Sequence, residues 1–318
     1  MALLLLCKGL KYENMKILIV CSGNSGSISP FVEEQAEALR YQGIGIDFFL
    51  IKGYGIVGYL KNLPILKEKI KSQQYDLIHA HYGFSGLLAS LQKTVPTIIT
   101  FHGSDINIRK NRIISYIASK LSIENIFVLP ILSHKIKYRR KIVHIIPCGV
   151  NLQTFYPIIS EQCRQKLGLK NNEKYILFSS LFGNKVKNYP LAKKAINLVD
   201  KNINLIELSG YSREKVNLLM NAVDLVLVTS HSESGPLVVK EAMACNCPIV
   251  STDVGDVKNV IGNTEGCYIT SYDPEDVAEK IKKAIAFGKR TSGRNNILHL
   301  ESSVIADKII DVYKKVLG

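Results

Sequence analysis

The sequence contains no tryptophan and only 4 methionines among its 318 residues. It also lacks any Cys-x-x-Cys pair, because its 7 cysteines are scattered along the chain, at positions 7, 21, 148, 163, 245, 247 and 267. This pattern excludes a disulfide-stapled secreted scaffold and favours free thiols in a reducing, cytoplasmic compartment. Histidine and cysteine do not recur at the spacings of a metal site, so we expect no bound metal.

Long apolar runs are missing as well. No segment approaches the roughly 18 uninterrupted apolar residues of a membrane-spanning helix. Residues 1–14 include a short leucine run, but no positive charge precedes it and no small-residue cleavage site follows it, which is unlike a secretory signal. We therefore interpret residues 1–14 as an extension ahead of the first strand, which begins at Met15.

Acidic residues are scarce in the first half of the chain. Residues 1–150 hold 19 lysines and arginines against 9 acidic residues, whereas residues 151–318 hold 22 against 18. The densest basic runs are residues 109–112 and 135–141. Such a surface fits nucleic acid, an anionic membrane or a simply solvated face. Nucleic acid is disfavoured, because the runs lack the interleaved aromatic residues of a known binding module.

What the sequence does contain is the alternation of strands and helices of an α/β protein. Residues 15–20 read as a buried strand, followed by a glycine–serine loop and a helix that starts near Pro30. The pattern restarts near residue 174, and a chain of this length is about two domains. We predict domains at residues 15–150 and 173–302, a linker at 151–172 and a terminal helix at 303–318.

The first glycine loop argues against a nicotinamide-dependent oxidoreductase. Its sequence, GNSGS at residues 23–27, is not the G-x-G-x-x-G of a dinucleotide site. No acidic residue clearly ends the next predicted strand, residues 46–51, to hold a ribose.

Residues 224–256 carry the strongest sign of a ligand site. An apolar strand gives way to a polar loop, and Pro236 is expected to be the first residue of the following helix. The first-turn N–H groups of a helix suit an anion, and Gly235 lets a phosphate approach the backbone closely. Glu233 and Glu241 flank this point. The alternative is an ordinary helix start with a solvated Glu241 and a loop acid at Glu233.

Two segments give these residues a family context. The stretch ESGPLVVKEAMACNCPIVSTDVGDV, residues 233–257, resembles the nucleotide-sugar-binding signature of the retaining glycosyltransferases of family 4. The segment TFHGSD, residues 100–105, resembles another part of that family. The resemblance implies the GT-B fold, an α/β architecture of two Rossmann-like doubly wound domains that face a central cleft. It also implies that the helix at residues 303–318 crosses back to the first domain.

The resemblance further implies a donor site. Glu233 would contact the donor sugar, Glu241 would contact the nucleotide ribose, and the backbone of the helix start would hold the diphosphate, through Gly235, Pro236, Leu237 and Val238. Lys187 matches the family's phosphate-binding lysine. The family's arginine is missing, since no arginine occurs between residues 175 and 200, and Lys185 is the candidate to replace it. On an extended loop, these two lysines would point the same way.

On the acceptor side, the resemblance implies that His102 lies beside the sugar. The loop that holds Gly23, Gly26 and Ser27 would lie near the acceptor. The catalytic residues predicted in this way are His102, Glu233 and Lys187.

These expectations together predict a retaining hexosyltransferase. It would move a sugar from a nucleoside diphosphate sugar, a UDP- or GDP-sugar, to a hydroxyl of a carbohydrate or lipid-linked acceptor, without a further cofactor. Cell-surface polysaccharide or glycolipid synthesis is the expected setting, with the protein in the cytoplasm and the inner membrane face as a candidate docking surface. The alternatives are a GT-B nucleotide-sugar epimerase or phosphorylase, and a basic membrane-surface binding protein that is not an enzyme.

Overall fold

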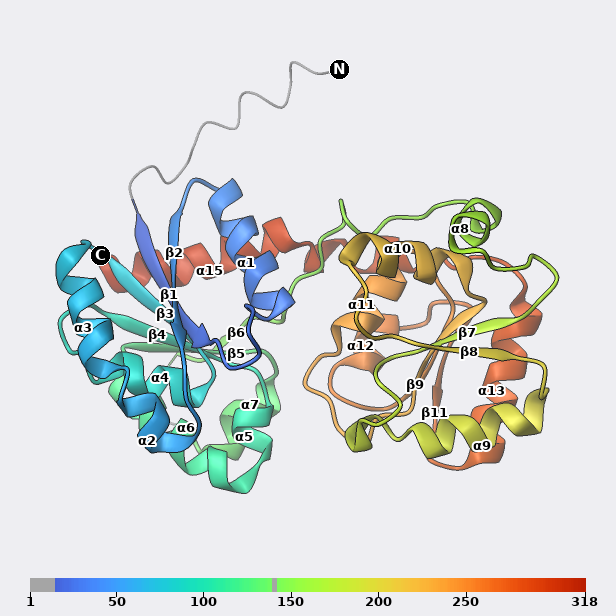
Figure 1. Cartoon of the computed structure of the whole chain (residues 1–318), viewed down its shortest axis with the longest axis horizontal. Helices are drawn as coiled ribbons and strands as arrows, with labels where there is room; N and C mark the ends of the chain where they lie inside the picture. The colour runs from blue at the N-terminus through green and yellow to red at the C-terminus, as the bar shows by residue number, and fades with distance from the viewer. Residues whose placement is uncertain (1–14, 139–141) are drawn as a thin grey trace, which may run out of the picture. The chain divides into compact units, whose positions relative to one another are not determined.

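The computed structural model describes residues 15–138 and 142–318 and divides into two compact units. The first unit runs to Gly149 and takes in Ser302–Gly318, and the second unit is Val150–Glu301 (Figure 1). The predicted extension at residues 1–14 lies outside the described residues, as do residues 139–141 of the second basic run.

The first unit is built on a parallel sheet with the strand order β2-β1-β3-β4-β5-β6. Its strands are β1 (Lys16–Ser22), β2 (Gly45–Ile51), β3 (Leu77–His81), β4 (Thr97–Phe101), β5 (Glu124–Phe127) and β6 (His144–Ile145). Its helices are α1 (Pro30–Tyr41), α2 (Gly55–Leu60), α3 (Leu63–Ser72), α4 (Gly83–Ser90), α5 (Ser104–Asn107), α6 (Arg109–Leu121), α7 (Pro130–Lys135) and α15 (Ser302–Leu317).

Helices cover both faces of this sheet, which is why its central strand β1 has apolar residues on both faces. In β1, Ile17 and Ile19 pack in one core with α1 and α15, whereas Leu18 and Val20 pack in the other core with α3, α4 and α6. All four side chains are fully buried. Successive strand residues point to opposite faces, so a strand buried on both sides needs apolar residues at every position.

The second unit repeats the plan with the strand order β11-β10-β9-β7-β8, again parallel. Its strands are β7 (Tyr175–Phe178), β8 (Asn204–Glu207), β9 (Leu225–Val228), β10 (Ile249–Thr252) and β11 (Cys267–Thr270). Its helices are α8 (Ser160–Leu167), η1 (Lys185–Lys187), α9 (Tyr189–Val199), α10 (Arg213–Ala222), α11 (Leu237–Ala244), α12 (Val257–Ile261), α13 (Pro274–Phe287), α14 (Gly293–Asn296) and η2 (Leu298–Leu300).

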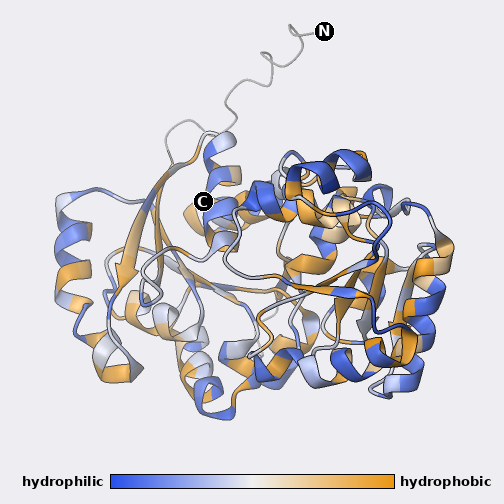
Figure 2. Ribbon diagram, turned by 45° about the vertical axis from the view of Figure 1, so that its right-hand side comes forward, coloured by the Kyte–Doolittle hydropathy of each residue, from blue (hydrophilic) through white to orange (hydrophobic). Residues whose placement is uncertain are grey.

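The two parallel sheets confirm the predicted α/β class with two Rossmann-like units. Figure 2 shows strands largely in the hydrophobic colour, while the surrounding helices alternate between hydrophobic and hydrophilic segments. Among the described residues, no helix is both long enough and apolar enough to cross a bilayer.

Residues 151–172, predicted to be a linker, are part of the second unit instead. They include α8, and Phe155 and Cys163 are fully buried in this unit. The Arg164 guanidinium donates to the Ala222 carbonyl over 2.8 Å and pairs with Asp224 over 3.1 Å. These anchors join residues far apart in the sequence, so local composition does not reveal them.

Each sheet has a switch point where consecutive strands leave in opposite directions. In the second unit, β8 lies on one side of β7 and β9 on the other; in the first unit, β2 and β3 flank β1 in the same way. Ligands of open parallel sheets bind at the carboxyl ends of the strands, at such points. The loops after β7 and β9 are therefore the first place to look for a site.

Candidate active site

A carboxylate and an ammonium group meet at the switch point of the second unit. The Lys187 ammonium, after β7, lies 2.6 Å from Glu233 Oε1, after β9. The Ser230 hydroxyl donates to the same carboxylate oxygen over 2.7 Å. Both charged side chains keep some exposure, 19% for Lys187 and 15% for Glu233, so a ligand can reach them. The structure thus brings together two of the three predicted catalytic residues.

The loop that carries Lys187 is tied to the loop after β9. The Thr229 hydroxyl donates to the Lys187 carbonyl over 2.9 Å, and the His231 N–H donates to the Val186 carbonyl over 2.8 Å. Asn188 has φ +54°, in the left-handed region that favours glycine and tolerates asparagine. This explains why an asparagine can stand at this position.

Lys185 and Lys187 do not point the same way, contrary to the prediction. They belong to η1, a 3₁₀ turn, where residues two apart are turned well away from each other. Lys185 is exposed, whereas Lys187 is directed at Glu233. The extended loop that this expectation assumed is therefore absent, and the role of Lys185 at the diphosphate stays a prediction.

The loop before α11 is closely packed at Gly235, against the loop that holds Gly255 and Asp256. Gly235 has φ +98°, and a Cβ there would lie 3.2 Å from Asp256 Oδ2. A Cβ at Gly255 would lie 2.6 Å from the Gly235 nitrogen. The backbone after β9 is therefore pressed against the backbone after β10, which fixes the path of the loop.

The helix itself begins one residue later than predicted. Pro236 is the N-cap of α11, with extended backbone angles, and Leu237 is the first helical residue. The Val239 N–H donates to the Pro236 carbonyl over 3.1 Å. The N–H groups of Leu237 and Val238 belong to the first turn, where a helix offers no acceptor of its own. A helix start at this loop still suits an anion.

Glu241 is nearly buried and is paired with an arginine that the sequence reading missed. Arg213 Nη2 lies 2.5 Å from Glu241 Oε1, and the Glu241 side chain is only 4% exposed. The Arg213 guanidinium lies over the Phe155 ring, 4.6 Å from its centroid. Arg213 starts α10, after β8. Arg213 could have been found only from the order of strands in the sheet, which places β8 beside β7.

A buried ion pair lies under the same loop. The Lys240 ammonium lies 3.1 Å from Asp256 Oδ2, and the two side chains are 1% and 12% exposed. Asp256 is the residue whose carboxylate faces Gly235. The pair therefore joins α11 to the loop after β10 at the point where Gly235 packs.

In the first unit, His102 lies at the carboxyl end of β4 among aromatic and polar groups. His102 Nε2 is 2.9 Å from Nδ1 of His81, and His102 Nδ1 is 3.8 Å from Cys148 Sγ. The rings of Phe31 and Tyr82 lie 4.7 Å from the His102 ring, centroid to centroid. Burial, and secondarily the neighbouring His81, lower the pKa of His102 well below its ordinary value. The imidazole is therefore neutral at pH 7, and it can donate or accept a hydrogen bond.

Asp105 shapes the turn that presents His102. Its carboxylate accepts hydrogen bonds from the N–H groups of Gly103 over 2.8 Å, Gly83 over 3.2 Å and His102 over 3.4 Å. Burial raises the pKa of Asp105 to about 6, although these bonds act in the opposite direction. Gly103 has φ +115°, which a side chain would not tolerate.

The glycine loop after β1 lies at the switch point of the first unit. The Gly23 N–H donates to the Ile51 carbonyl over 2.8 Å, and a Cβ at Gly23 would lie 2.9 Å from Leu50 Cβ. Gly26 has φ +83°, and the Ser25 hydroxyl donates to the Ser27 carbonyl over 2.9 Å. The three residues predicted for the acceptor side therefore form one compact turn.

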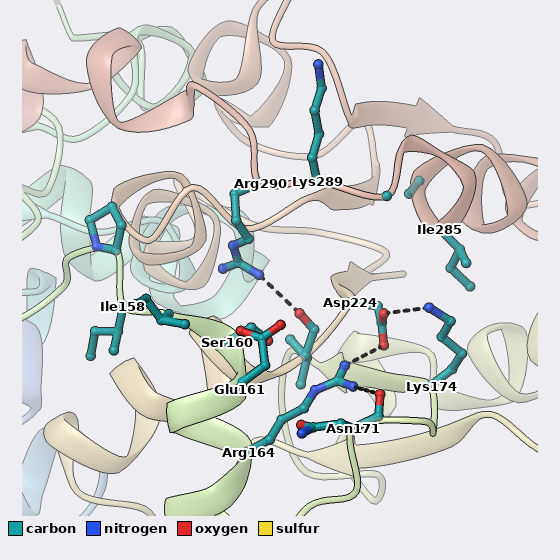
Figure 3. Close-up of a pocket in the computed structure, with 15 residues that line it drawn as sticks. Ile158, Ser160, Glu161, Arg164, Asn171, Lys174, Asp224, Ile285, Lys289 and Arg290 are labelled. Carbon is teal, nitrogen blue, oxygen red and sulfur yellow. Dashed lines mark hydrogen bonds and ion pairs between the residues drawn. The ribbon is translucent and has the colours of Figure 1, made fainter.

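A pocket of about 630 Å³ lies elsewhere, at the amino ends of β7 and β9 (Figure 3). Its two arginines serve the fold: Arg164 donates to the Ala222 and Asn171 carbonyls, and Arg290 donates to the Met220, Val223 and Cys245 carbonyls. Ligands of parallel sheets bind at the carboxyl ends of the strands, whereas this pocket lies at their amino ends. Despite its size, we therefore do not assign it as the active site. Among the residues that the structure describes, no group of three or more histidine, cysteine or acidic side chains is arranged to hold a metal ion.

Comparison with known proteins shows two family models that match this chain. The model of Glycosyltransferase Family 4 matches residues 2–154, and that of Glycosyl transferases group 1 matches residues 203–292. The chain is 32% identical over 255 residues to an uncharacterized glycosyltransferase of Methanocaldococcus jannaschii, which covers 74% of this chain and 73% of the relative.

Two further similarities bear on the setting and on the fold. The chain is 25% identical over 248 residues to a glycosyltransferase assigned to teichuronic acid biosynthesis in Bacillus subtilis, covering 69% of this chain and 64% of that protein, just under two thirds of its length. Among solved structures, Anabaena HepE in complex with UDP-glucose superposes with a TM-score of 0.76 at 17% identity, covering 95% of this chain and 100% of that one.

Proposed function

Because this chain belongs to the glycosyltransferases of family 4, the glycosyl transferases group 1, we propose that it transfers a sugar from a nucleoside diphosphate sugar to an acceptor hydroxyl with retention of configuration. In the reaction, the bond between the anomeric carbon and the diphosphate oxygen breaks. A bond to the acceptor oxygen forms, and the diphosphate leaves with increased negative charge. The proton that the acceptor hydroxyl loses passes to an oxygen of the leaving diphosphate or to water.

One observation carries the proposal: the Lys187–Glu233 pair lies at 2.6 Å at the switch point, where the Gly235 loop leads into α11. A cation and the amino end of a helix suit a diphosphate. A carboxylate beside them suits sugar hydroxyls, which donate hydrogen bonds. A charge-assisted bond to a group that gains charge as the reaction proceeds stabilises the transition state more than the ground state.

The remaining residues receive roles in the same scheme. Glu241, held by Arg213, would accept hydrogen bonds from the ribose hydroxyls. The backbone of Leu237 and Val238 would bind the diphosphate. His102 of the first unit would meet a sugar hydroxyl through its neutral imidazole, and the loop of Gly23, Gly26 and Ser27 would border the acceptor. We name no nucleophile, since neither the sequence nor the geometry singles one out.

A UDP-sugar is the donor to try first, because Anabaena HepE, which has the same fold, is in complex with UDP-glucose. For the acceptor we propose a cell-surface polysaccharide or a lipid-linked precursor, as the Bacillus relative's assignment suggests. The enzyme would then work at the inner face of the membrane. The basic balance of residues 1–150 supports this, because anionic lipids attract lysine and arginine.

The test combines titration calorimetry with product analysis. UDP, UDP-glucose, GDP and GDP-mannose are titrated into the full chain, and a donor that binds is then incubated with candidate acceptors. Retention is read from the anomeric proton coupling of the product by NMR. A sugar 1-phosphate formed with inorganic phosphate as the acceptor would indicate a phosphorylase instead, and free sugar or an epimer formed without any acceptor would indicate an epimerase. Binding to vesicles by a protein that binds no nucleotide would indicate a membrane-binding protein without this activity.

A further inference from the structure

Helix α6 (labelled in Figure 1) carries its large apolar side chains on the outside. Ile113, Tyr116, Ile117 and Leu121 are 62%, 43%, 43% and 46% exposed. The buried positions, apart from Ile114, hold only small residues: Ser115, Ala118 and Ser119. An ordinary surface helix has the opposite arrangement, with its apolar stripe facing the core.

The inner face is small because α6 packs closely on α4. A Cβ at Gly83, the first residue of α4, would lie 2.1 Å from the Ser115 hydroxyl and 2.9 Å from Ser115 Cα. The Ser115 hydroxyl donates to the Asp105 carbonyl over 2.8 Å. This contact requires small residues inside, but it requires nothing of the outer face. Packing within the unit therefore does not account for the four large apolar residues outside.

The charged side chains that α6 carries on this outer face are all positive. Arg109, Lys110 and Lys120 are exposed, and the Lys120 ammonium lies 5.5 Å from the centroid of the Tyr116 ring. In the sequence, no acidic residue occurs between Asp105 and Glu124. Arg112 differs, because its guanidinium donates to the Ile106 carbonyl over 2.7 Å and so serves the fold.

We propose that the outer face of α6, formed by Arg109, Lys110, Ile113, Tyr116, Ile117, Lys120 and Leu121, lies in the headgroup layer of an anionic bilayer. Apolar side chains among cations, in a helix that lies flat, are the features of an interfacial helix. A second copy of the chain fits less well, because two such faces would bring like charges together. The inference rests on the proposed function for its purpose, which is to hold the enzyme beside a membrane-linked acceptor.

The absence of tryptophan allows a direct test in the full-length protein. Tyr116→Trp places one fluorophore on the proposed surface. As a control, Tyr41→Trp places one at the end of α1, which covers the face of the sheet opposite to that covered by α6. Tyr41 is 77% exposed. With vesicles of phosphatidylglycerol and phosphatidylcholine, the indole emission of the Tyr116→Trp variant should shift to the blue, and that of the Tyr41→Trp variant should not. Equal shifts in the two variants, or no shift in the Tyr116→Trp variant, would overturn the proposal.

Vesicle sedimentation separates the two parts of the interaction. Arg109→Gln with Lys110→Gln should weaken binding about 25-fold, since each cation near an anionic surface contributes about fivefold. Ile113→Ser should weaken it about tenfold even at high salt, because an apolar anchor is lost. Leu298→Ser, at a residue 52% exposed in the second unit, should have no effect. A blue shift of the Tyr116→Trp variant that follows protein concentration without vesicles would indicate a dimer interface and refute the proposal.

Failure of this inference is distinguishable from failure of the proposed function. UDP titration of the same variants reports on the second unit alone, which contains the switch point at β7 and β9. Normal UDP binding without vesicle insertion rejects only the docking surface. Vesicle insertion without nucleotide binding rejects only the transferase.

Discussion

At the scale of single residues, Glu233 and Glu241 differ in what holds them. Glu233 is paired with Lys187 on the neighbouring loop and keeps 15% of its side chain exposed. Glu241 is almost buried and is paired with Arg213. The partly exposed Glu233 carboxylate can exchange its bond to Lys187 for a bond to a ligand, whereas the buried Glu241 carboxylate is held in one orientation. This difference leads to separate expectations for their substitution.

We expect Glu241→Ala to weaken UDP and UDP-sugar equally, and Glu233→Ala to weaken only the part of the affinity that the sugar contributes. Each lost charge-assisted hydrogen bond corresponds to about 1.5–3 kcal/mol, or about 10- to 100-fold in affinity. Calorimetry with UDP and with UDP-glucose separates the two effects. Arg213→Gln serves as the matched variant, and it should behave like Glu241→Ala. Equal losses for both ligands in all three variants would contradict these roles.

The two lysines of η1 should also differ. Lys187→Ala is expected to lower kcat by about 10- to 100-fold and to change KM less, because the charge that Lys187 neutralises peaks in the transition state. Lys185→Ala should leave kcat and KM almost unchanged, since Lys185 is exposed and lies on a different side of the 3₁₀ turn from Lys187. Steady-state kinetics of both variants, each with and without EDTA, decide the matter. Full activity of Lys187→Ala would show that the phosphate site lies elsewhere, and a loss in EDTA would show that a metal supplies part of the charge.

At the scale of elements, the donor site depends on two loops that press against each other. The loop after β9 holds Gly235, and the loop after β10 holds Gly255 and Asp256. Lys240 connects them from α11 through its ion pair with Asp256. Since both charges are buried, the pair fixes the position of α11 relative to the loop after β10. It does so at the free-energy cost of removing the two charged groups from water.

Asp256→Asn is therefore expected to destabilise the protein by about 3 kcal/mol, because Lys240 loses its countercharge inside the protein. UDP affinity should fall as well, since the Asp256 carboxylate packs against Gly235. Urea unfolding and calorimetry measure the two effects. The double variant Lys240→Met with Asp256→Asn should recover part of the stability. As a control, Lys283→Met removes the exposed ion pair of Lys283 with Glu279 and should leave the urea midpoint unchanged. A similar loss of stability in Asp256→Asn and Lys283→Met would refute the special role of the buried pair.

At the scale of the whole molecule, the buried His79 and His81 and the partly buried His102 make stability depend on pH. His79 binds the Tyr313 hydroxyl of α15 over 2.7 Å and the Thr100 hydroxyl over 2.7 Å, and His81 and His102 are bonded to each other. Burial lowers the pKa of all three, that of His81 to about 3. The folded protein thus stays neutral at these positions at a pH where the unfolded chain is protonated.

The sign of the pH effect follows from proton binding. Below the unfolded histidine pKa of about 6.5, the unfolded chain binds protons that the folded protein does not, so stability is fully present above that pH and is lost as the pH falls toward 3. Asp105 acts the other way, because burial raises its pKa to about 6. Its contribution is present below pH 4 and is lost as the pH rises through 6. Three histidines outweigh one aspartate.

We expect the free energy of unfolding to fall by about 3 kcal/mol between pH 7.5 and pH 5.5. Urea unfolding followed by circular dichroism at the two pH values measures the change. His81→Asn removes one of the three titrating groups and should reduce the difference by about 1.4 kcal/mol. A midpoint that does not move between the two pH values would contradict the expectation.

Local patterns in the sequence were enough to predict the fold class and the location of the helix start at the candidate donor site. Mainly apolar strands alternating with helices are typical of parallel sheets covered on both faces, and both sheets are of that kind. The local chemistry of Gly235, Pro236 and the two glutamates located the helix start within one residue. These features depend on a few neighbouring residues, which is why sequence sufficed.

The pairs of residues that meet in the candidate site could not be predicted in this way, because they depend on the folded arrangement of the strands. The order of strands in the sheet brought Arg213 to Glu241 and Lys187 to Glu233, over separations in sequence that no local pattern spans. The 3₁₀ turn at η1 depends on hydrogen bonds from the loop after β9, so the divergence of Lys185 and Lys187 was not visible either. Residues 151–172 read as a linker because their anchors, such as the Arg164–Asp224 pair, belong to contacts distant in sequence. Such contacts form only when loop closure brings distant segments together, and composition carries no record of that.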